Sequence, residues 1–432
     1  MGASGRDKSD SLTSIEICAG AGGQALGLHG AGFRHLALVE IDKNAHKTLE
    51  KNITSHSDWG DCEPLNEDLV SAFESSRPMA ALGGRALKVE KEKGELDLLA
   101  GGVPCPPFSV AGKQLGAADE RDLFPRMVEL IDDLRPRAVM IENVRGIMDA
   151  KFDEYCNSLI KEIEGLGYWF CGWHLLEAHN YGVPQLRPRS VFVAIRESER
   201  EKAGLDVDGF PWPVRVAGHK KNVFEALDKT MESRRDRLIE EFPEHVTRIK
   251  DAYEIWRDKA SQAGSVAPTL VGGSKKHGGA DLGPSRAKTA WRALGVSAVG
   301  VADDIDEVTK IIAEKHLERE FLRPEGPMLT VQQAALIQSF PTDWKFEGGK
   351  TAQYRQVGNA FPPPVAEAVG RAIASVLQPE RREELLKDLV IERLGAKRGK
   401  RAFRQAEIAE LIDVSPVAEA ALDDRSGDLI GA

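Results

Sequence analysis

Short apolar runs alternate with amphipathic segments through the first half of the chain. Helical spacing is found at residues 123–134 and 152–166, and shorter amphipathic stretches follow residues 23 and 41. Such alternation of strands and helices is typical of a parallel sheet with helices on both faces. We therefore predict an α/β fold with a doubly wound, Rossmann-like sheet. Its strands are expected at residues 14–18, 36–40, 96–100, 138–142, 174–178 and 190–195.

The alternation is lost after residue 195, which predicts a second, smaller domain. Residues 228–259 are charged with helical character, and residues 264–288 are rich in Gly, Ser, Lys and His. Apolar periodicity returns at residues 329–337 and in a last amphipathic helix at 365–377. The expected organisation is a disordered leader (1–13), a first domain (14–195 and 323–378), a second domain (196–322) and a partly disordered extension (379–432).

Composition narrows the class of protein. The 432 residues carry a net charge of −10, which argues against a surface coated in basic residues but leaves room for a local basic face. No apolar run approaches the ~18 residues of a membrane helix, and the polar start has no signal core. Five cysteines without a C-x-x-C spacing argue against disulfides or a zinc knuckle, and indicate a reducing, cytoplasmic setting.

Cys105 is the first candidate for chemistry. Two glycines end the predicted strand at 96–100, and three prolines flank the cysteine and stiffen its loop. Open α/β sheets bind ligands at the carboxyl ends of their parallel strands. The thiol is therefore a candidate nucleophile, and a small buried cysteine is the alternative.

A glycine-rich turn predicts a cofactor site. Gly20, Gly22 and Gly23 lie between the first strand and its helix, and Glu40 closes the next strand. Glycines allow a cofactor to approach the backbone, and an acidic residue at this distance can hold ribose hydroxyls. A nicotinamide dinucleotide or S-adenosylmethionine fits, and a turn without ligand is the alternative. Asp68 could accept a hydrogen bond from an adenine amino group, or be a solvated or capping aspartate.

A carboxylate and two arginines complete the candidate chemistry. Glu142 ends a predicted strand, so we expect it at the same sheet edge as Cys105. A thiolate can add to an electron-poor ring carbon, and a nearby carboxyl group can supply a proton to the ring; a turn-capping carboxylate is the alternative. Arg187 and Arg189 suit a planar base oxygen or a phosphate, against the alternative of surface ion pairs.

These motifs, in this order, resemble the DNA (cytosine-5)-methyltransferase family over residues 14–196 and 329–377. Residues 16–23 are similar to its S-adenosylmethionine loop, 39–42 to its ribose-binding strand end and 102–109 to its nucleophile loop. Residues 142–144 are similar to the segment of its catalytic carboxylate. Gln185-x-Arg-x-Arg189 and Gln356-Val-Gly-Asn359, before a proline-rich approach to the last helix, complete the series.

The resemblance implies a mechanism. Cys105 would attack carbon 6 of a flipped-out cytosine, Glu142 would bind or protonate nitrogen 3, and Arg189 would bind the carbonyl oxygen. The methyl group of S-adenosylmethionine would pass to carbon 5, without a metal. The implied catalytic residues are Cys105, Glu142, Arg187 and Arg189. The implied cofactor residues are Cys18, Ala19, Gly20, Gly22, Gly23, Glu40, Ile41, Asp68, Leu69, Pro104, Leu123, Asn359 and Ala360.

The second domain corresponds in position to the family's target-recognition domain. Its expected DNA contacts, with Ser109 of the nucleophile loop, are Thr269, Lys275, Lys276, Arg286 and Lys288; a solvated loop is the alternative. The expected setting is a bacterial restriction-modification system. There a monomer acts on double-stranded DNA of the nucleoid, in the cytoplasm and away from membranes. A cognate restriction endonuclease would act at the same site without forming a stable complex.

Two positions depart from the family pattern, and two other functions compete. Cys18 stands where an aromatic residue is common, and Pro106 where glutamine usually follows the nucleophile.

A transfer-RNA cytosine methyltransferase would carry a Cys-Phe-Thr signature, and the chain has none. An inactive DNA-binding regulator would not need Cys105, Glu142 and Arg189 together. Both alternatives are therefore disfavoured.

Overall fold

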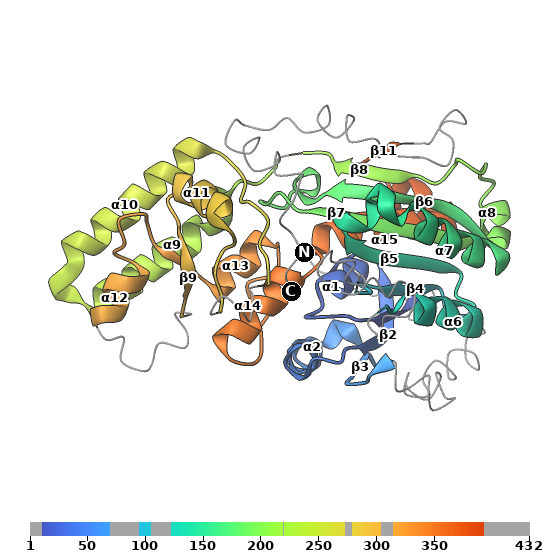
Figure 1. Cartoon of the computed structure of the whole chain (residues 1–432), viewed down its shortest axis with the longest axis horizontal. Coiled ribbons are helices and arrows are strands. Elements are labelled where there is room, and N and C mark those ends of the chain that lie inside the picture. The colour runs from blue at the N-terminus through green and yellow to red at the C-terminus, as the bar shows by residue number, and fades with distance from the viewer. Residues whose placement is uncertain are drawn as a thin grey trace. The chain divides into compact units, whose positions relative to one another are not determined.

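The computed structural model describes residues 11–69, 95–104, 122–218, 220–272, 279–303 and 314–392 (Figure 1). They divide into two compact units. The first unit contains the described residues as far as Glu177, Pro188–Ala217, and those from Phe361 to Glu392. The second contains Ala178–Arg187 and Gly218–Ala360.

A seven-stranded sheet organises the first unit, in the order β3-β2-β1-β4-β5-β7-β6. The sheet is largely parallel, which confirms the predicted fold class. Its five parallel neighbours are β1 (Leu12–Ile17), β2 (Phe33–Val39), β3 (Glu63–Leu65), β4 (Leu98–Gly101) and β5 (Ala138–Val144).

One strand, β7, runs against the parallel direction that we expected from the alternation of strands and helices. β7 (Pro188–Arg196) lies between β5 and β6 (Tyr168–Glu177) and is antiparallel to both. Only residues 178–187 connect β6 to β7. A parallel crossover needs about a dozen residues or more, so this connection can only reverse the chain.

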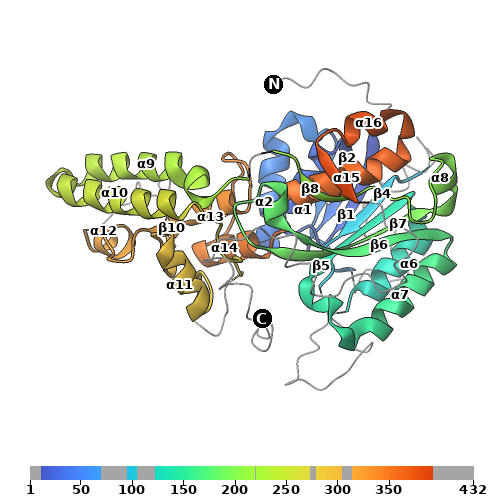
Figure 2. The same ribbon diagram turned by 90° about the horizontal axis from the view of Figure 1, so that it is seen from above.

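Helices cover both faces of the sheet (Figure 2). On one face lie α1 (Gly23–Gly30) and α15 (Pro363–Leu377), and on the other α6 (Phe124–Leu134) and α7 (Asp153–Gly165). α2 (Lys43–Ser55) follows β2. A buried cluster joins alternate strand residues to the apolar side of α6, because side chains two positions apart share one face of a strand. It includes Ile15, Ile17, Leu99, Val139, Ile141, Phe124, Met127 and Ile131.

Segments that we assigned to other domains also belong to the first unit. β8 (Trp212–Val216) pairs antiparallel with β11 (Leu389–Glu392), although we expected the second domain from 196 and an extension from 379. Each strand is preceded in the chain by a short helix: α8 (Glu197–Lys202) comes before β8, and α16 (Arg382–Leu385) comes before β11. Arg382 donates to the carbonyl of Ala203 at 3.0 Å, which ties the two segments together.

The second unit is mainly helical. The charged stretch predicted at 228–259 forms α9 (Val223–Glu241) and α10 (Val246–Ala263), with Pro243 in the break between them. Two short strands, β9 (Ser297–Ala302) and β10 (Met328–Thr330), pair in parallel. The described residues of this unit also form α11 (Ser285–Ala293), α12 (Glu314–Glu320), α13 (Val331–Ile337) and α14 (Lys350–Asn359).

Two further observations concern helices. Gln356–Asn359, expected in a stiff approach to the last helix, are the last residues of α14. Among the described helices, none is both long enough and apolar enough to cross a membrane.

The contact between α1 and α15 generates a prediction. A Cβ at Gly27 would lie 2.2 Å from the carbonyl oxygen of Pro363 and 2.5 Å from the Cβ of Ala366. We predict that Gly27→Ala lowers the free energy of unfolding by about 1–3 kcal/mol, because the helices must separate. Urea unfolding measures this. Gly165→Ala is the control, since that exposed helix position has no atom within 4 Å of the added Cβ. Equal midpoints for the two variants would contradict the prediction.

Candidate active site

The glycine loop between β1 and α1 is held in a left-handed backbone conformation. Cys18, Gly20 and Gly22 have φ values of 52°, 56° and 88°. Such values are open to glycine and cost other residues about 1–2 kcal/mol, so Cys18 is strained. The amide of Ala19 donates to the carbonyl of Val39 at 3.0 Å, which joins the loop to the end of β2. The loop therefore presents its backbone at the carboxyl edge of the sheet.

Glu40 fastens this loop. One carboxylate oxygen accepts from the Gly20 amide and the other from the Asp42 amide, each at 2.7 Å. Burial raises the pKa of Glu40, and these two hydrogen bonds oppose the rise. The predicted ribose ligand is thus also the residue that shapes the glycine turn.

Other predicted cofactor residues lie on neighbouring strand ends and helix starts. Ile41 is 62% exposed, which is unusual for a large apolar side chain beside a buried carboxylate. Asp68 is half-buried and Leu69 buried after β3, and half-buried Leu123 precedes α6. These positions belong to the first unit. Asn359 is the last residue of α14 and Ala360 caps that helix. Both belong to the second unit, so these two predicted cofactor residues are described separately from those of the first unit.

The predicted nucleophile itself lies outside the described residues, as do Ser109 and Pro106. The chain is described as far as Pro104, which is exposed. The loop starts from a fixed point, because the Asn143 side chain donates to the carbonyl of Val103 at 2.9 Å. A Cβ at Gly102 would lie 3.2 Å from a carboxylate oxygen of Glu142. The start of the cysteine loop and the predicted acid are therefore neighbours.

Glu142 and Arg189 form an ion pair, with 2.9 Å between Nε and Oε1 and each side chain 12% exposed. The antiparallel register of β5 and β7 brings them together, since Val144 is paired with Arg189. A second hydrogen bond, from Nη1 of Arg189 to the carbonyl of Pro188 at 2.9 Å, orients the guanidinium. Burial lowers the pKa of Arg189, and Glu142 and Glu177 oppose that change. The structure thus brings together Glu142 and Arg189, the predicted acid and the predicted base-binding arginine, at one edge of the sheet.

Arg187 occupies a different position. Its wholly buried guanidinium donates to the carbonyls of Leu270 and Gly358, both at 2.7 Å, within the second unit. Gln185 accepts from the amide of Leu270 at 2.7 Å. The two side chains therefore clamp the backbone of Leu270. Our assignment of Arg187 to catalysis is not supported by these contacts, because both of its terminal nitrogens donate to protein carbonyls.

The expected DNA contacts have mixed surroundings in the second unit. The hydroxyl of Thr269 donates to the carbonyl of Leu186 at 2.7 Å, and Arg286 is exposed on α11. Nζ of Lys288 lies 3.2 Å from a carboxylate oxygen of Asp281, and this ion pair partly neutralises the positive charge of the lysine. Lys275 and Lys276 lie outside the described residues.

Sequence reasoning did not single out Glu16. It is 1% exposed on β1, and its Oε2 has no hydrogen-bond partner in the described part of the chain. Burial raises its pKa well above the ordinary value, and Glu142 and Glu40 add to the rise. The same burial, with Glu40 and Glu16, raises the pKa of Cys18. The carboxyl groups of Glu16, Glu40 and Glu142 are thus close enough for the last two to raise the pKa of Glu16.

This raised pKa predicts a pH dependence. The folded chain keeps a proton on Glu16 that the unfolded chain loses above a pKa of ~4.3. Above that value the stability falls by about 1.4 kcal/mol per pH unit, until the pKa of the folded state is reached. Glu16→Gln mimics the neutral acid and removes this loss. Urea unfolding between pH 5 and 8 should therefore favour the variant increasingly as pH rises.

The control for this experiment is Glu164→Gln, at an exposed position on α7. If wild type and Glu16→Gln lose stability in parallel across the range, Glu16 is ionised in the folded chain and the prediction is wrong.

Comparison with known proteins identifies methyltransferases as relatives of this chain. Type II methyltransferase M.NaeI of Lentzea aerocolonigenes is 45% identical over 375 residues, which cover 86% of this chain and 76% of the relative. Type II methyltransferase M.NgoMIV of Neisseria gonorrhoeae is 41% identical over 372 residues, 85% of this chain and 99% of the relative.

A solved structure of a candidate DNA modification methyltransferase, encoded within a prophage (E. coli), has a TM-score of 0.52 and 21% identity. It covers 85% of this chain and 100% of its own, and at that identity it supports the fold alone. Residues 12–375 match the sequence pattern of the family described as C-5 cytosine-specific DNA methylase. The match spans most of the chain, and the protein belongs to the C-5 cytosine-specific DNA methylases.

Proposed function

We propose that this protein methylates carbon 5 of one cytosine within a short sequence of double-stranded DNA, using S-adenosylmethionine. The observation that carries the proposal is the buried ion pair of Glu142 and Arg189, beside the start of the loop that leads to Cys105. A carboxyl group and a guanidinium are the groups that can hold nitrogen 3 and the carbonyl oxygen of cytosine.

The glycine loop suits the cofactor. S-adenosylmethionine supplies a methyl group on a positively charged sulfonium, which makes that methyl electrophilic. A Cβ at Gly20 would have no atom within 4 Å, so space remains beside the backbone there. The buried carboxyl group of Glu40, whose charged form is favoured by two amide hydrogen bonds, suits a cationic ligand. We assign Glu40 to the ribose, Asp68 to the adenine amino group and the exposed Ile41 to an apolar contact.

The remaining chemistry belongs to Cys105, Glu142 and Arg189. The Cys105 thiolate forms a bond to carbon 6, while Glu142 hydrogen-bonds or protonates nitrogen 3. Arg189 binds the carbonyl oxygen, and carbon 5 becomes electron-rich enough to accept the methyl group, whose bond to sulfur breaks and leaves S-adenosylhomocysteine as the product. A base then removes the proton from carbon 5, and the electrons of that C–H bond expel the thiolate. The target base must leave the helix first, at a cost of a few kcal/mol.

We assign DNA recognition to the second unit. Gln185 and Arg187 support this assignment because they fix the backbone of Leu270, next to Thr269, in a segment where side chains could meet a groove. Exposed Arg286 suits a phosphate. Ser109, Lys275, Lys276 and Lys288 complete the proposed contacts.

We also propose a setting in restriction-modification. The two relatives compared above are Type II methyltransferases. Modification of one short sequence would protect the DNA from an endonuclease that cuts at the same site. We propose that the protein acts as a monomer on nucleoid DNA in the cytoplasm and forms no stable complex with that endonuclease.

Methylation of genomic DNA tests the function directly. We predict that bisulfite sequencing of DNA from cells expressing the protein finds 5-methylcytosine at one position of one short motif. DNA from cells with an empty vector is the control. Soluble protein without methylation above that control would overturn the proposal.

The role of Cys105 has its own test. We predict that Cys105→Ala lowers the rate of methyl transfer by more than about 10³-fold, because no bond to carbon 6 can form. S-adenosylmethionine binding, measured by calorimetry, should remain close to that of wild type. Cys62→Ala, a half-buried thiol near β3, is the control and should keep activity. Loss of cofactor affinity in Cys105→Ala would assign that residue to the cofactor site instead.

A further inference from the structure

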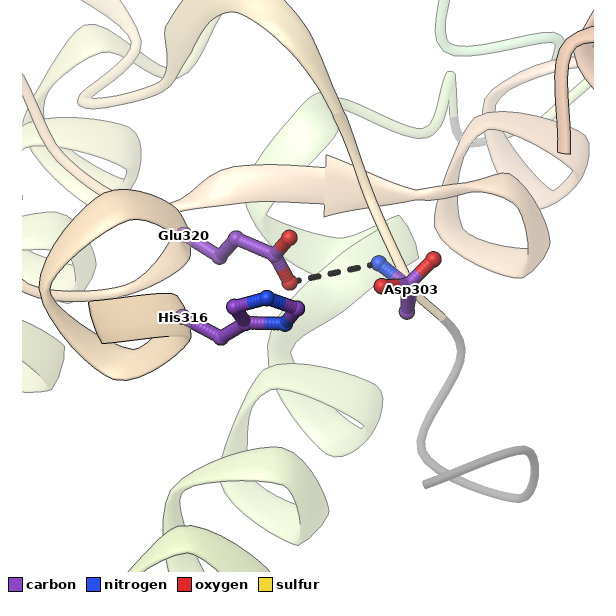
Figure 3. Close-up of side chains that lie close together, drawn as sticks. All are labelled: Asp303, His316 and Glu320. Atoms are coloured by element: carbon purple, nitrogen blue, oxygen red, sulfur yellow. Dashed lines mark hydrogen bonds between the residues drawn. The ribbon is translucent and has the colours of Figure 1, made fainter. Parts of the chain in front are cut away.

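Three metal-ligating side chains meet in the second unit, in a place that the methyl-transfer chemistry does not use. Asp303 directly follows β9, and His316 and Glu320 lie one helical turn apart on α12. One ligand atom from each residue lies within 4.8 Å of the other two. Figure 3 shows the imidazole and the Glu320 carboxylate on the side of α12 that is turned toward Asp303.

Both oxygens of Glu320 and one oxygen of Asp303 already have partners, but a carboxylate oxygen that accepts one hydrogen bond keeps a second lone pair for a metal. One oxygen of Asp303 lies 2.9 Å from Nζ of Lys350, and one oxygen of Glu320 pairs with Arg319. The other Glu320 oxygen accepts from the amide of Asp303 at 3.3 Å. Among the described residues, none forms a hydrogen bond with the ring of His316.

The two flanking cations do not remove the attraction for a metal. The side chains of Arg319 and Lys350 are 51% and 34% exposed, so water screens their pairs with the carboxylates. The Glu320 side chain is only 9% exposed, which places its charge in a medium of lower dielectric. Where the three ligand atoms converge, two carboxylates and an imidazole therefore face one another.

The donor set selects the class of cation. Imidazole suits zinc and other transition metals, whereas a site of oxygen ligands alone would suit magnesium or calcium. His316 and Glu320 have the i, i+4 spacing by which a helix places two metal ligands on one face. Three protein ligands would leave one position of a tetrahedral zinc ion for water, an open coordination that differs from the four protein ligands of most structural zinc sites. We propose that Asp303, His316 and Glu320 bind one zinc ion, which joins the end of β9 to α12.

The proposed ion has no part in methyl transfer, and its role is to link two elements of the second unit. It ties the end of β9 to α12, the next described element of the chain, within the unit that we assign to DNA recognition. It also departs from our expectation, based on sequence, of a protein without a metal. The cysteine spacings gave no zinc motif, and a single histidine with two carboxylates has no distinctive pattern in the sequence.

Zinc binding to the full chain tests the proposal. The protein is treated with EDTA, dialysed and titrated with zinc chloride in a calorimeter. We expect one zinc ion per chain to be lost, or bound at least ~10-fold more weakly, in His316→Ala and in Asp303→Asn. Both replaced side chains are partly exposed, which limits the effect on folding, and far-UV circular dichroism checks the fold. His245→Ala, a histidine elsewhere in the same unit, should bind zinc as wild type does.

X-ray absorption at the zinc edge gives a second measurement. A shell of nitrogen and oxygen at about 2.0–2.2 Å, without sulfur, supports the site. A shell containing sulfur would show that cysteines bind the ion and would overturn the proposal. Equal zinc binding by wild type, His316→Ala and Asp303→Asn would overturn it too. Methylation activity is not the readout, so failure here would leave the proposed function untouched.

Discussion

The antiparallel pairing of β7 with β5 is the constraint on which the candidate active site depends. In a wholly parallel sheet, the residue that starts a strand lies at the amino edge, away from the ligand-binding ends of its neighbours. Because β7 is reversed, its start meets the end of β5, and Arg189 lies beside Glu142. Removal of either partner from such a buried pair leaves an uncompensated charge, at a cost of about 3–5 kcal/mol. The reversal therefore fixes both the position and the partner of each group.

The same short segment of chain serves two purposes. Gln185 and Arg187 bind the backbone of Leu270 in the second unit, and two residues later Arg189 enters the sheet of the first. Arg187 and Arg189 are alike in the sequence, but their surroundings give them different tasks. One guanidinium meets backbone carbonyls and the other a carboxylate. The proline between them starts β7, and it has no amide to donate to the sheet.

Much of this could be predicted from the sequence. Apolar runs identified the strands around β1, β4 and β5, and the turn residues after them identified the sheet edge where Glu40 and Glu142 lie. The direction of β7 could not be predicted from its own residues, because an apolar strand has the same pattern in either direction. The division of labour between Arg187 and Arg189 depends on Leu270 and Gly358, which are far along the chain. Glu16 was missed because a single acid within an apolar strand gives no periodic signal.

Burial and the carboxyl groups at this edge also determine the protonation state of Cys18. Burial, together with Glu40 and Glu16, raises the pKa of Cys18 and keeps it a thiol at neutral pH. A thiol is a poor nucleophile, since the thiolate is the reactive form. Cys18 therefore contributes volume and a strained turn beside Gly20, and does not compete for an electrophile. The strain of about 1–2 kcal/mol at Cys18 is tolerated because Glu40 fixes the turn from the other side, through the Gly20 amide. The glycine loop is thus shaped by the same acid that we assign to the ribose, which couples the fold of the turn to the proposed cofactor site.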